Sequence, residues 1–80
     1  MYFVYILYSH SFDRYYIGLS KDKEERLKSH NLGRVKSTKP FKPWIIVHNE
    51  VFETRIEARK REKYFKSAAG RRWRSNNLGM

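Results

Sequence analysis

The segment MYFVYILYSHSFDRYYIGLS, residues 1–20, contains the strongest structural signal in this chain. β-Branched and aromatic residues predominate from residue 1 to residue 9, and they resume at YYIGL, residues 15–19, after the interruption HSFDR. Two such runs around a short polar stretch are typical of a β-hairpin. With an even number of loop residues, Tyr5 and Tyr16 share one face of the hairpin, because side chains alternate along each strand. The opposite face then carries Val4, Ile6, Tyr15 and Ile17.

A first helix is predicted to begin at Asp22, because Glu25 three residues later completes a capping box. The acids of DKEE, residues 22–25, suit the positive end of the helix dipole, and the glycine that ends residues 31–33 supplies the stop. Arg26 and His30 are four residues apart and therefore share a face of this helix. On spacing alone, that face is compatible with either a solvated surface or a site.

The second half of the chain supplies a loop, a strand and a helix. Residues 33–43 contain two prolines and a glycine and are predicted to form a basic loop. WIIVHNEVF, residues 44–52, is predicted to be a third strand. A second helix is then expected to be capped by Thr54 and to end at Gly70, with a short helical tail after it. The sequence therefore predicts one α/β domain over residues 1–80, with the order β-β-α-β-α and a short C-terminal helix.

The charge of the chain points to an anionic partner. Eighteen lysines and arginines against eight acids give a net charge of +10. Residues 34–43 carry four positive charges and no acid, and residues 55–74 carry nine against two acids. Such segregation favours a surface for nucleic acid, although an acidic protein or a membrane would respond to the same charge. Affinity for nucleic acid is expected from six cations: Lys36, Lys39, Lys42, Arg59, Lys63 and Lys66.

Several classes of site are excluded by composition. The chain has no cysteine, so it has neither a disulfide framework nor a thiolate zinc site. Glycine-rich phosphate loops, nucleophile elbows and spaced His/Cys ligand sets are also missing from the sequence. Residues 1–10 are apolar over too short a stretch to span a bilayer and lack the basic start of a signal peptide. We therefore expect a soluble cytoplasmic domain with no membrane partner.

Glu62 contradicts the pattern of the predicted second helix. At 100° per residue it lies in the same narrow sector as Ala58, Phe65 and Ala69, and therefore within a small apolar stripe. A carboxylate on such a face must find a cation, a metal or several donors, because an unpaired buried charge costs several kcal/mol. A structural ion pair and a functional carboxylate both satisfy this requirement, and the periodicity does not decide between them.

These features together resemble the GIY-YIG nuclease superfamily, in particular its small single-domain bacterial branch. The resemblance runs through FVYIL, YYIGLSKDKEERLKSHN, STKPFKPWIIV and EARKREKYFKS, which together make up most of the chain. The first motif is degenerate, with FVY in place of Gly-Ile-Tyr, whereas the second, YIG at residues 16–18, is intact. Leu19 stands where some relatives have a lysine, and the late asparagine of many relatives has no assigned counterpart among Asn76 and Asn77.

The resemblance implies a three-stranded antiparallel sheet flanked by helices, with a phosphodiesterase site on one sheet face. It assigns catalytic roles to Tyr5 and Tyr16 from the two motifs, to Arg26 and His30 from the helix, and to Glu62 as the single acidic ligand of one Mg²⁺ or Mn²⁺. Arg26 would hold the phosphate as a fork of donors. Tyr5 is the expected general base, with His30 or Tyr16 relaying the proton.

We therefore expect a divalent-metal-dependent endonuclease that hydrolyses phosphodiester bonds, in DNA rather than RNA. The alternative is a nucleic-acid-binding module that keeps the fold and the basic surface but has little activity. A basic adaptor for an acidic protein is a third hypothesis, with no motif in its favour. The structure of the substrate is left open, as is the choice between a monomer, a dimer and a protein that relies on a separate specificity partner.

Overall fold

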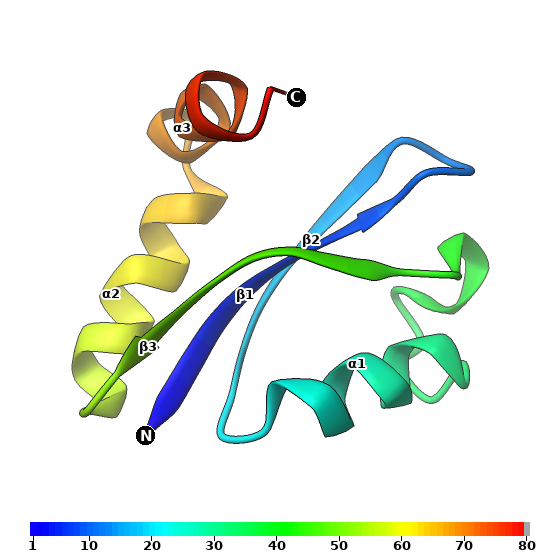
Figure 1. Ribbon diagram of the computed structural model, residues 1–80, viewed down its shortest axis with the longest axis horizontal. Helices are drawn as coiled ribbons and strands as arrows, with labels where there is room; N and C mark the ends of the chain where they lie inside the picture. The colour runs from blue at the N-terminus through cyan, green and yellow to red at the C-terminus, as the bar shows by residue number, and fades with distance from the viewer. Residues whose placement is uncertain (80) are drawn as a thin grey trace.

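Three strands form one antiparallel sheet in which β1 (Tyr2–Ser9) lies between β2 (Arg14–Ser20) and β3 (Ile45–Phe52) (Figure 1). The computed structural model describes residues 1–79. Helix α1 (Lys23–Asn31) follows the hairpin, and a short 3-10 turn, η1 (Lys39–Phe41), precedes β3. Helices α2 (Arg55–Lys66) and α3 (Ala68–Leu78) complete the chain. This is the predicted β-β-α-β-α order, with a sheet flanked by helices.

The register of the hairpin confirms the predicted division of the tyrosines. A four-residue loop joins β1 to β2, so that Tyr5 pairs with Gly18 and Leu7 pairs with Tyr16. The Tyr8 hydroxyl donates to Asp13 Oδ1 over 2.9 Å, and Asp13 turns the chain with a φ of 51°. Tyr5 and Tyr16 consequently lie on one face of the sheet, as the alternation of side chains requires.

The two faces of the sheet are buried by different elements. One face packs Val4, Ile6 and Ile17 against Ala58 and Phe65 of α2, and Trp73 of α3 joins this core. The other face packs three further residues against the α1 side of the molecule: Tyr5, Leu7 and Trp44. Figure 1 shows α2 and α3 on one side of the strands and α1 on the other. The sheet therefore separates an aliphatic and aromatic core from a second core that contains the tyrosine of the first motif.

The second helix ends earlier than the sequence predicted. It stops at Lys66 because Ser67 adopts an extended conformation and accepts a hydrogen bond from the Gly70 N–H as the N-cap of α3. Gly70 is thus inside α3 rather than at a helix stop, and the C-terminal helix has 11 residues instead of being a short tail. A Cβ on Gly70 would overlap the Phe65 carbonyl, so glycine permits the close approach of α2 and α3. Ala69, which the periodicity placed on the stripe of the second helix, belongs to α3.

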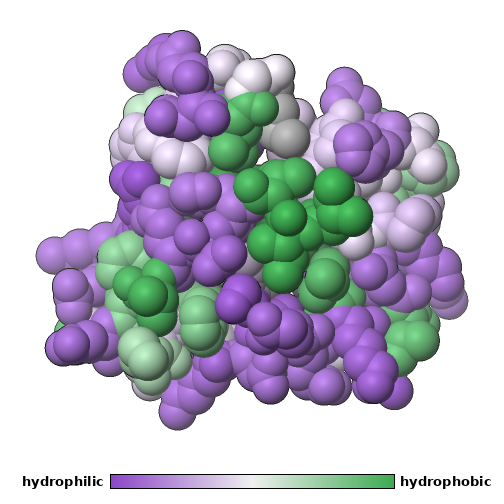
Figure 2. All heavy atoms as spheres, viewed as in Figure 1, coloured by the Kyte–Doolittle hydropathy of each residue, from purple (hydrophilic) through white to green (hydrophobic). Residues whose placement is uncertain are grey.

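Two further observations concern the start of the third strand and the length of the helices. The third strand begins at Ile45, because the Trp44 N–H donates to Asn31 Oδ1 over 2.6 Å and its indole N–H donates to the Thr38 carbonyl over 3.0 Å. Within residues 1–79, no helix has the length and apolar character needed to cross a membrane. The face drawn in Figure 2 is mostly hydrophilic, with a hydrophobic group of side chains near its centre.

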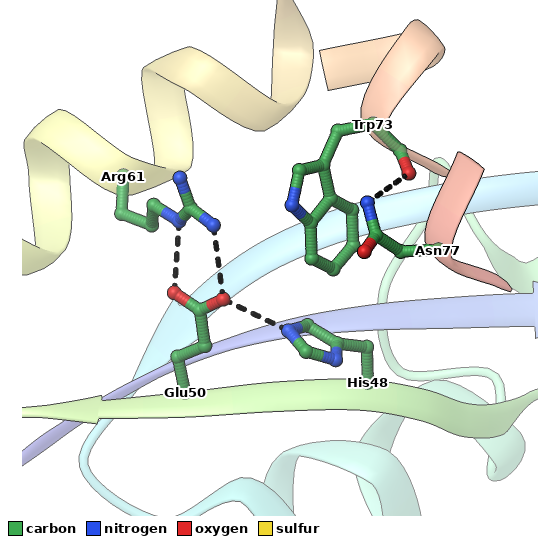
Figure 3. Close-up of polar contacts among 5 residues, drawn as sticks. All are labelled: His48, Glu50, Arg61, Trp73 and Asn77. Carbon is green, nitrogen blue, oxygen red and sulfur yellow. Dashed lines mark hydrogen bonds and ion pairs between the residues drawn. The ribbon is translucent and has the colours of Figure 1, made fainter. Parts of the chain in front are cut away.

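An ion cluster of Glu50, Arg61 and His48 connects the edge strand β3 to α2 (Figure 3). The Glu50 carboxylate accepts from Arg61 Nε over 2.8 Å and from Arg61 Nη2 over 3.1 Å, and it lies 2.9 Å from His48 Nε2. The Trp73 ring packs against His48 with a centroid separation of 4.7 Å. Burial raises the pKa of Glu50, but the hydrogen bonds from Arg61 and His48 outweigh burial and leave that pKa lowered. His48 thus has a structural role between β3, α2 and α3.

Removing the Glu50 charge should destabilise the domain by about 1–3 kcal/mol, because Arg61 and His48 lose a charged acceptor. The folded-state pKa of Glu50 is below its unfolded value, so its contribution is complete above the unfolded pKa. That contribution disappears as the pH falls through the lowered folded-state pKa. Urea unfolding of wild type and Glu50→Gln across an acid pH series should therefore show a stability difference that shrinks on acidification.

Glu53→Gln is the matched control, because Glu53 is exposed and its substitution removes the same charge just beyond β3. It should leave stability within about 0.5 kcal/mol of wild type. Equal stability losses in the two variants, or a difference that stays constant in acid, would contradict the role assigned to the cluster.

Candidate active site

A buried group of aromatic and polar side chains lies on the sheet face toward α1. Tyr5 is 1% exposed and His30 is 0% exposed, and Tyr5 Oη lies 3.4 Å from His30 Nε2. The Tyr16 ring packs against the His30 ring with centroids 4.8 Å apart. The hairpin and α1 therefore bring together three of the residues that the sequence proposed for catalysis, from positions up to 25 residues apart.

The two ring nitrogens of His30 contact Thr38 and Tyr5. The Thr38 hydroxyl donates to the Val35 carbonyl over 3.3 Å, and Thr38 Oγ1 lies 2.7 Å from His30 Nδ1. With the hydroxyl proton directed to Val35, Thr38 accepts from Nδ1–H, and neutral His30 presents Nε2 as an acceptor toward Tyr5; we assign this tautomer from these contacts. Burial, with a smaller effect of the Arg26 charge, lowers the pKa of His30 to about 4. His30 is consequently neutral at physiological pH and accepts a hydrogen bond from the Tyr5 phenol.

The Tyr5 phenol is protonated over the same pH range. Burial, which is the largest influence, and the nearby Tyr16 and Glu62 raise the pKa of Tyr5, whereas Arg26 lowers it, and the net result is about 12. A phenol with an ordinary pKa of about 10 accepts a proton only if neighbouring positive charge lowers that pKa. Arg26 acts in that direction, but in the protein alone burial outweighs it. Tyr5 is therefore a hydrogen-bond donor. It can act as a base only if it transfers its own proton to another group.

Gly18 makes the position of Tyr5 possible. It pairs with Tyr5 across the hairpin, and a Cβ at residue 18 would overlap the Tyr5 ring and hydroxyl. The ring is buried and rigid, so a larger residue at this position would displace it. The glycine of the YIG motif thus has a steric function that sequence reasoning did not identify. Its signal was present in the register, because a glycine opposite a buried tyrosine marks a close approach.

Arg26 and Glu62 border this cluster from two helices. Arg26 is exposed on α1, near enough to Tyr5 and His30 to influence the pKa of each. The Glu62 side chain on α2 is 16% exposed, and its Oε2 lies 3.3 Å from Nζ of Lys66. Lys66 itself is 55% exposed, and a pair of this kind contributes about 0.3–0.5 kcal/mol. The ion pair predicted as one outcome for Glu62 is present, but it is a weak one.

The donor set fits a hard divalent cation held by one carboxylate. Within residues 1–79, no three histidine, aspartate or glutamate side chains converge in a way that could hold a metal ion. Mg²⁺ keeps several waters and binds through one or two carboxylates together with substrate phosphates. Glu62 supplies an oxygen donor of this kind, and the charge of its carboxylate raises the pKa of Tyr5. A cation at Glu62 would therefore complete its coordination with water and phosphate oxygens.

Comparison with known proteins agrees with this arrangement. The sequence matches the GIY-YIG catalytic domain over residues 1–76. The chain belongs to the GIY-YIG family. It is 43% identical to a UPF0213 protein of Listeria welshimeri over 65 residues, which cover 80% of this chain and 71% of the relative. A UPF0213 protein of Staphylococcus saprophyticus is 43% identical over 53 residues, which are 65% of each chain.

A solved structure shares the fold of this GIY-YIG protein. The solution NMR structure of the UPF0213 protein BH0048 from Bacillus halodurans superposes with a TM-score of 0.54 and 28% sequence identity. The superposition covers 91% of this chain and 81% of that one. The family match identifies a nuclease family, and the relatives place this chain among its UPF0213 members.

The cationic residues proposed from the sequence all lie at the surface. Side chains of the basic loop and of α2 are exposed at six positions: Lys36, Lys39, Lys42, Arg59, Lys63 and Lys66. The same loop also contains Thr38, which is 1% exposed and holds His30. The segment that the sequence analysis treated only as a basic loop therefore also positions a residue of the candidate site.

Proposed function

We propose that this GIY-YIG protein is an endonuclease that hydrolyses phosphodiester bonds in DNA with one divalent cation, Mg²⁺ or Mn²⁺. The proposal rests on the meeting of Tyr5, Tyr16 and His30 on one sheet face, with Arg26 exposed beside them and Glu62 close enough to act on Tyr5. A module that only binds nucleic acid needs the surface cations, and it has no need for this buried polar group.

The pair of Tyr5 and His30 supports a two-step transfer of one proton. His30 Nε2 is an acceptor that lies 3.4 Å from Tyr5 Oη, and Thr38 holds the other ring nitrogen. An attacking water would give its proton to Tyr5 Oη as the phenol proton moves to Nε2, so Tyr5 need not be ionised beforehand. This geometry favours His30 over Tyr16 as the relay, since His30 faces Tyr5 with a free lone pair.

Arg26 and Glu62 would act on the phosphate. The exposed guanidinium of Arg26 can donate two parallel hydrogen bonds to non-bridging oxygens. Glu62 would hold the cation, which when bound supplies charge neutralisation at the phosphate and the leaving 3′ oxygen. The net charge of +10 attracts the polyanionic substrate to this face and to the basic loop.

The pH dependence of cleavage tests the roles of Tyr5 and His30. Because His30 has a pKa of about 4 and Tyr5 a pKa of about 12, both are in their active protonation states across the neutral range. We expect kcat/KM for cleavage of labelled DNA at saturating Mn²⁺ to change little between about pH 6 and pH 8. An acid limb near the ordinary histidine pKa would show that His30 is not the buried neutral acceptor proposed here. Circular dichroism over the same range controls for unfolding.

A further inference from the structure

An open pocket lies beside β2, outside the catalytic cluster. Its volume is about 310 Å³, and it is bounded by the edge strand β2, the C-terminal end of α2 and the beginning of α3. Its apolar wall consists of Tyr15, Ile17 and Phe65. Its polar lining consists of Lys66, Arg71 and Arg74, and none of the acidic residues within residues 1–79 lines it. The volume is at the lower end of the range for small-ligand pockets.

The composition of these walls selects the chemistry of a ligand. Three cations on one side of a pocket favour an anion with several oxygens, and arginine binds phosphate through paired donors. The lining also includes an aromatic surface, where the Arg74 guanidinium lies over the Tyr15 ring, 4.6 Å from its centroid. A flat or apolar group joined to a phosphate matches both walls. Nucleotides have this combination, since aromatic rings and arginine planes both stack on bases.

Two lining residues connect this pocket to the catalytic cluster. Tyr16 lines the pocket, and its ring also packs against His30. Lys66 lines the pocket, and its Nζ lies 3.3 Å from Glu62 Oε2. Tyr15 and Tyr16 are neighbours on the edge strand β2, so the pocket and the catalytic cluster meet at this strand. A nucleic acid strand bound at the catalytic cluster can therefore continue directly into the pocket.

We propose that this pocket is a subsite for one nucleotide of the substrate strand, next to the bond that is cleaved. Lys66 and Arg71 bind the phosphate of that nucleotide, and its base or sugar packs on the half-buried Tyr15 ring and on the Arg74 guanidinium stacked over it. The placement next to the cleaved bond rests on the proposed nuclease function, whereas binding of the nucleotide does not. The subsite would set the strand in register, so that the neighbouring phosphate reaches Arg26 and Glu62.

Binding of thymidine 3′,5′-bisphosphate, followed by two-dimensional NMR in EDTA, tests the subsite without any cleavage. The probe should shift the amide signals of residues 15–17, 65–66 and 71–74, and inorganic phosphate should bind at least about tenfold more weakly because it lacks the stacking group. Shifts confined to other regions, or equal affinities for the two probes, would overturn the nucleotide assignment.

Arg71→Glu and Arg72→Glu provide a matched pair. Both residues are exposed on α3, and both substitutions change the net charge by the same amount, but only Arg71 lines the pocket. Arg71→Glu should weaken bisphosphate binding about tenfold or more, and Arg72→Glu should weaken it less than about threefold. Equal losses would show that only overall charge is involved and would overturn the proposal. If Arg71→Glu melts early, Arg71→Gln gives the same comparison with Arg72→Gln.

Cleavage assays separate this proposal from the nuclease function. If the protein binds the bisphosphate at the pocket but cuts no DNA, the pocket is a nucleotide site. Its assignment as a substrate subsite is then wrong. DNA cleavage at the wild-type rate by Arg71→Glu would likewise overturn the subsite, while leaving the nuclease function intact.

Discussion

Glu62→Gln should reduce metal-dependent cleavage by orders of magnitude while the fold and DNA binding persist. The substitution keeps the shape of the side chain and removes the charge that would hold the cation. Stability should change little, because the Glu62 carboxylate has a weak, largely exposed partner in Lys66, at 3.3 Å. Cleavage rate, DNA affinity and melting temperature should be measured on the same sample of the variant.

Glu57→Gln is the control for this experiment. Glu57 is an exposed acid on the same helix, so its substitution removes one negative charge without touching the cluster. It should cleave DNA at close to the wild-type rate. A Glu62→Gln protein that cuts as fast as wild type would exclude the single-carboxylate mechanism. If the melting temperature of Glu62→Gln instead falls by a large amount, and cleavage falls only in proportion to the unfolded fraction, then Glu62 has a structural role in its ion pair with Lys66.

Arg26→Lys should lower kcat/KM for cleavage by about 100-fold, although it preserves the positive charge. An ammonium is a point donor and cannot reproduce the two parallel hydrogen bonds of a guanidinium to phosphate. Arg26 is exposed, so the variant should fold and melt as wild type does. Steady-state cleavage of a labelled DNA substrate at saturating Mn²⁺ measures the effect.

The same substitution at Arg72 controls for the loss of an arginine as such. Arg72 is exposed on α3 and lies outside both the catalytic cluster and the pocket. Arg72→Lys should change kcat/KM by less than about twofold. Turnover of Arg26→Lys within the same limit would assign Arg26 to a solvated helix face, with no role at the phosphate.

Local sequence rules predicted most of the elements of this fold. The alternation of side chains in the hairpin placed Tyr5 and Tyr16 on one face, and the register confirms it. The Asp22 cap of α1 is confirmed by a hydrogen bond of 3.0 Å from the Glu25 N–H to Asp22 Oδ1. Thr54 caps α2 as expected. These features depend on residues a few positions apart, where periodicity and capping preferences are sufficient.

Other parts of the structure depend on contacts that no local rule contains. Glycine commonly ends helices, but Gly70 lies inside α3. Glycine is needed there because the Phe65 carbonyl lies where a Cβ atom would be. The hydrogen bond between Thr38 and His30 joins a loop to a helix and holds the ring nitrogen that is not directed at Tyr5. The pocket beside β2 is lined from both sides of the break between α2 and α3 at Ser67, whereas the sequence predicted the helix to continue to Gly70. Tertiary packing, rather than intrinsic propensity, determines all three.

The proposed function requires that this site hydrolyse phosphodiester bonds with a bound divalent cation. Its most direct test is cleavage by the wild-type protein of a panel of end-labelled single-stranded, duplex and branched DNAs, in parallel with Mg²⁺, with Mn²⁺ and with EDTA. We predict cleavage of at least one DNA structure with either cation and none in EDTA. Cleavage that continues undiminished in EDTA, or no cleavage of any structure with either cation, would contradict this proposal.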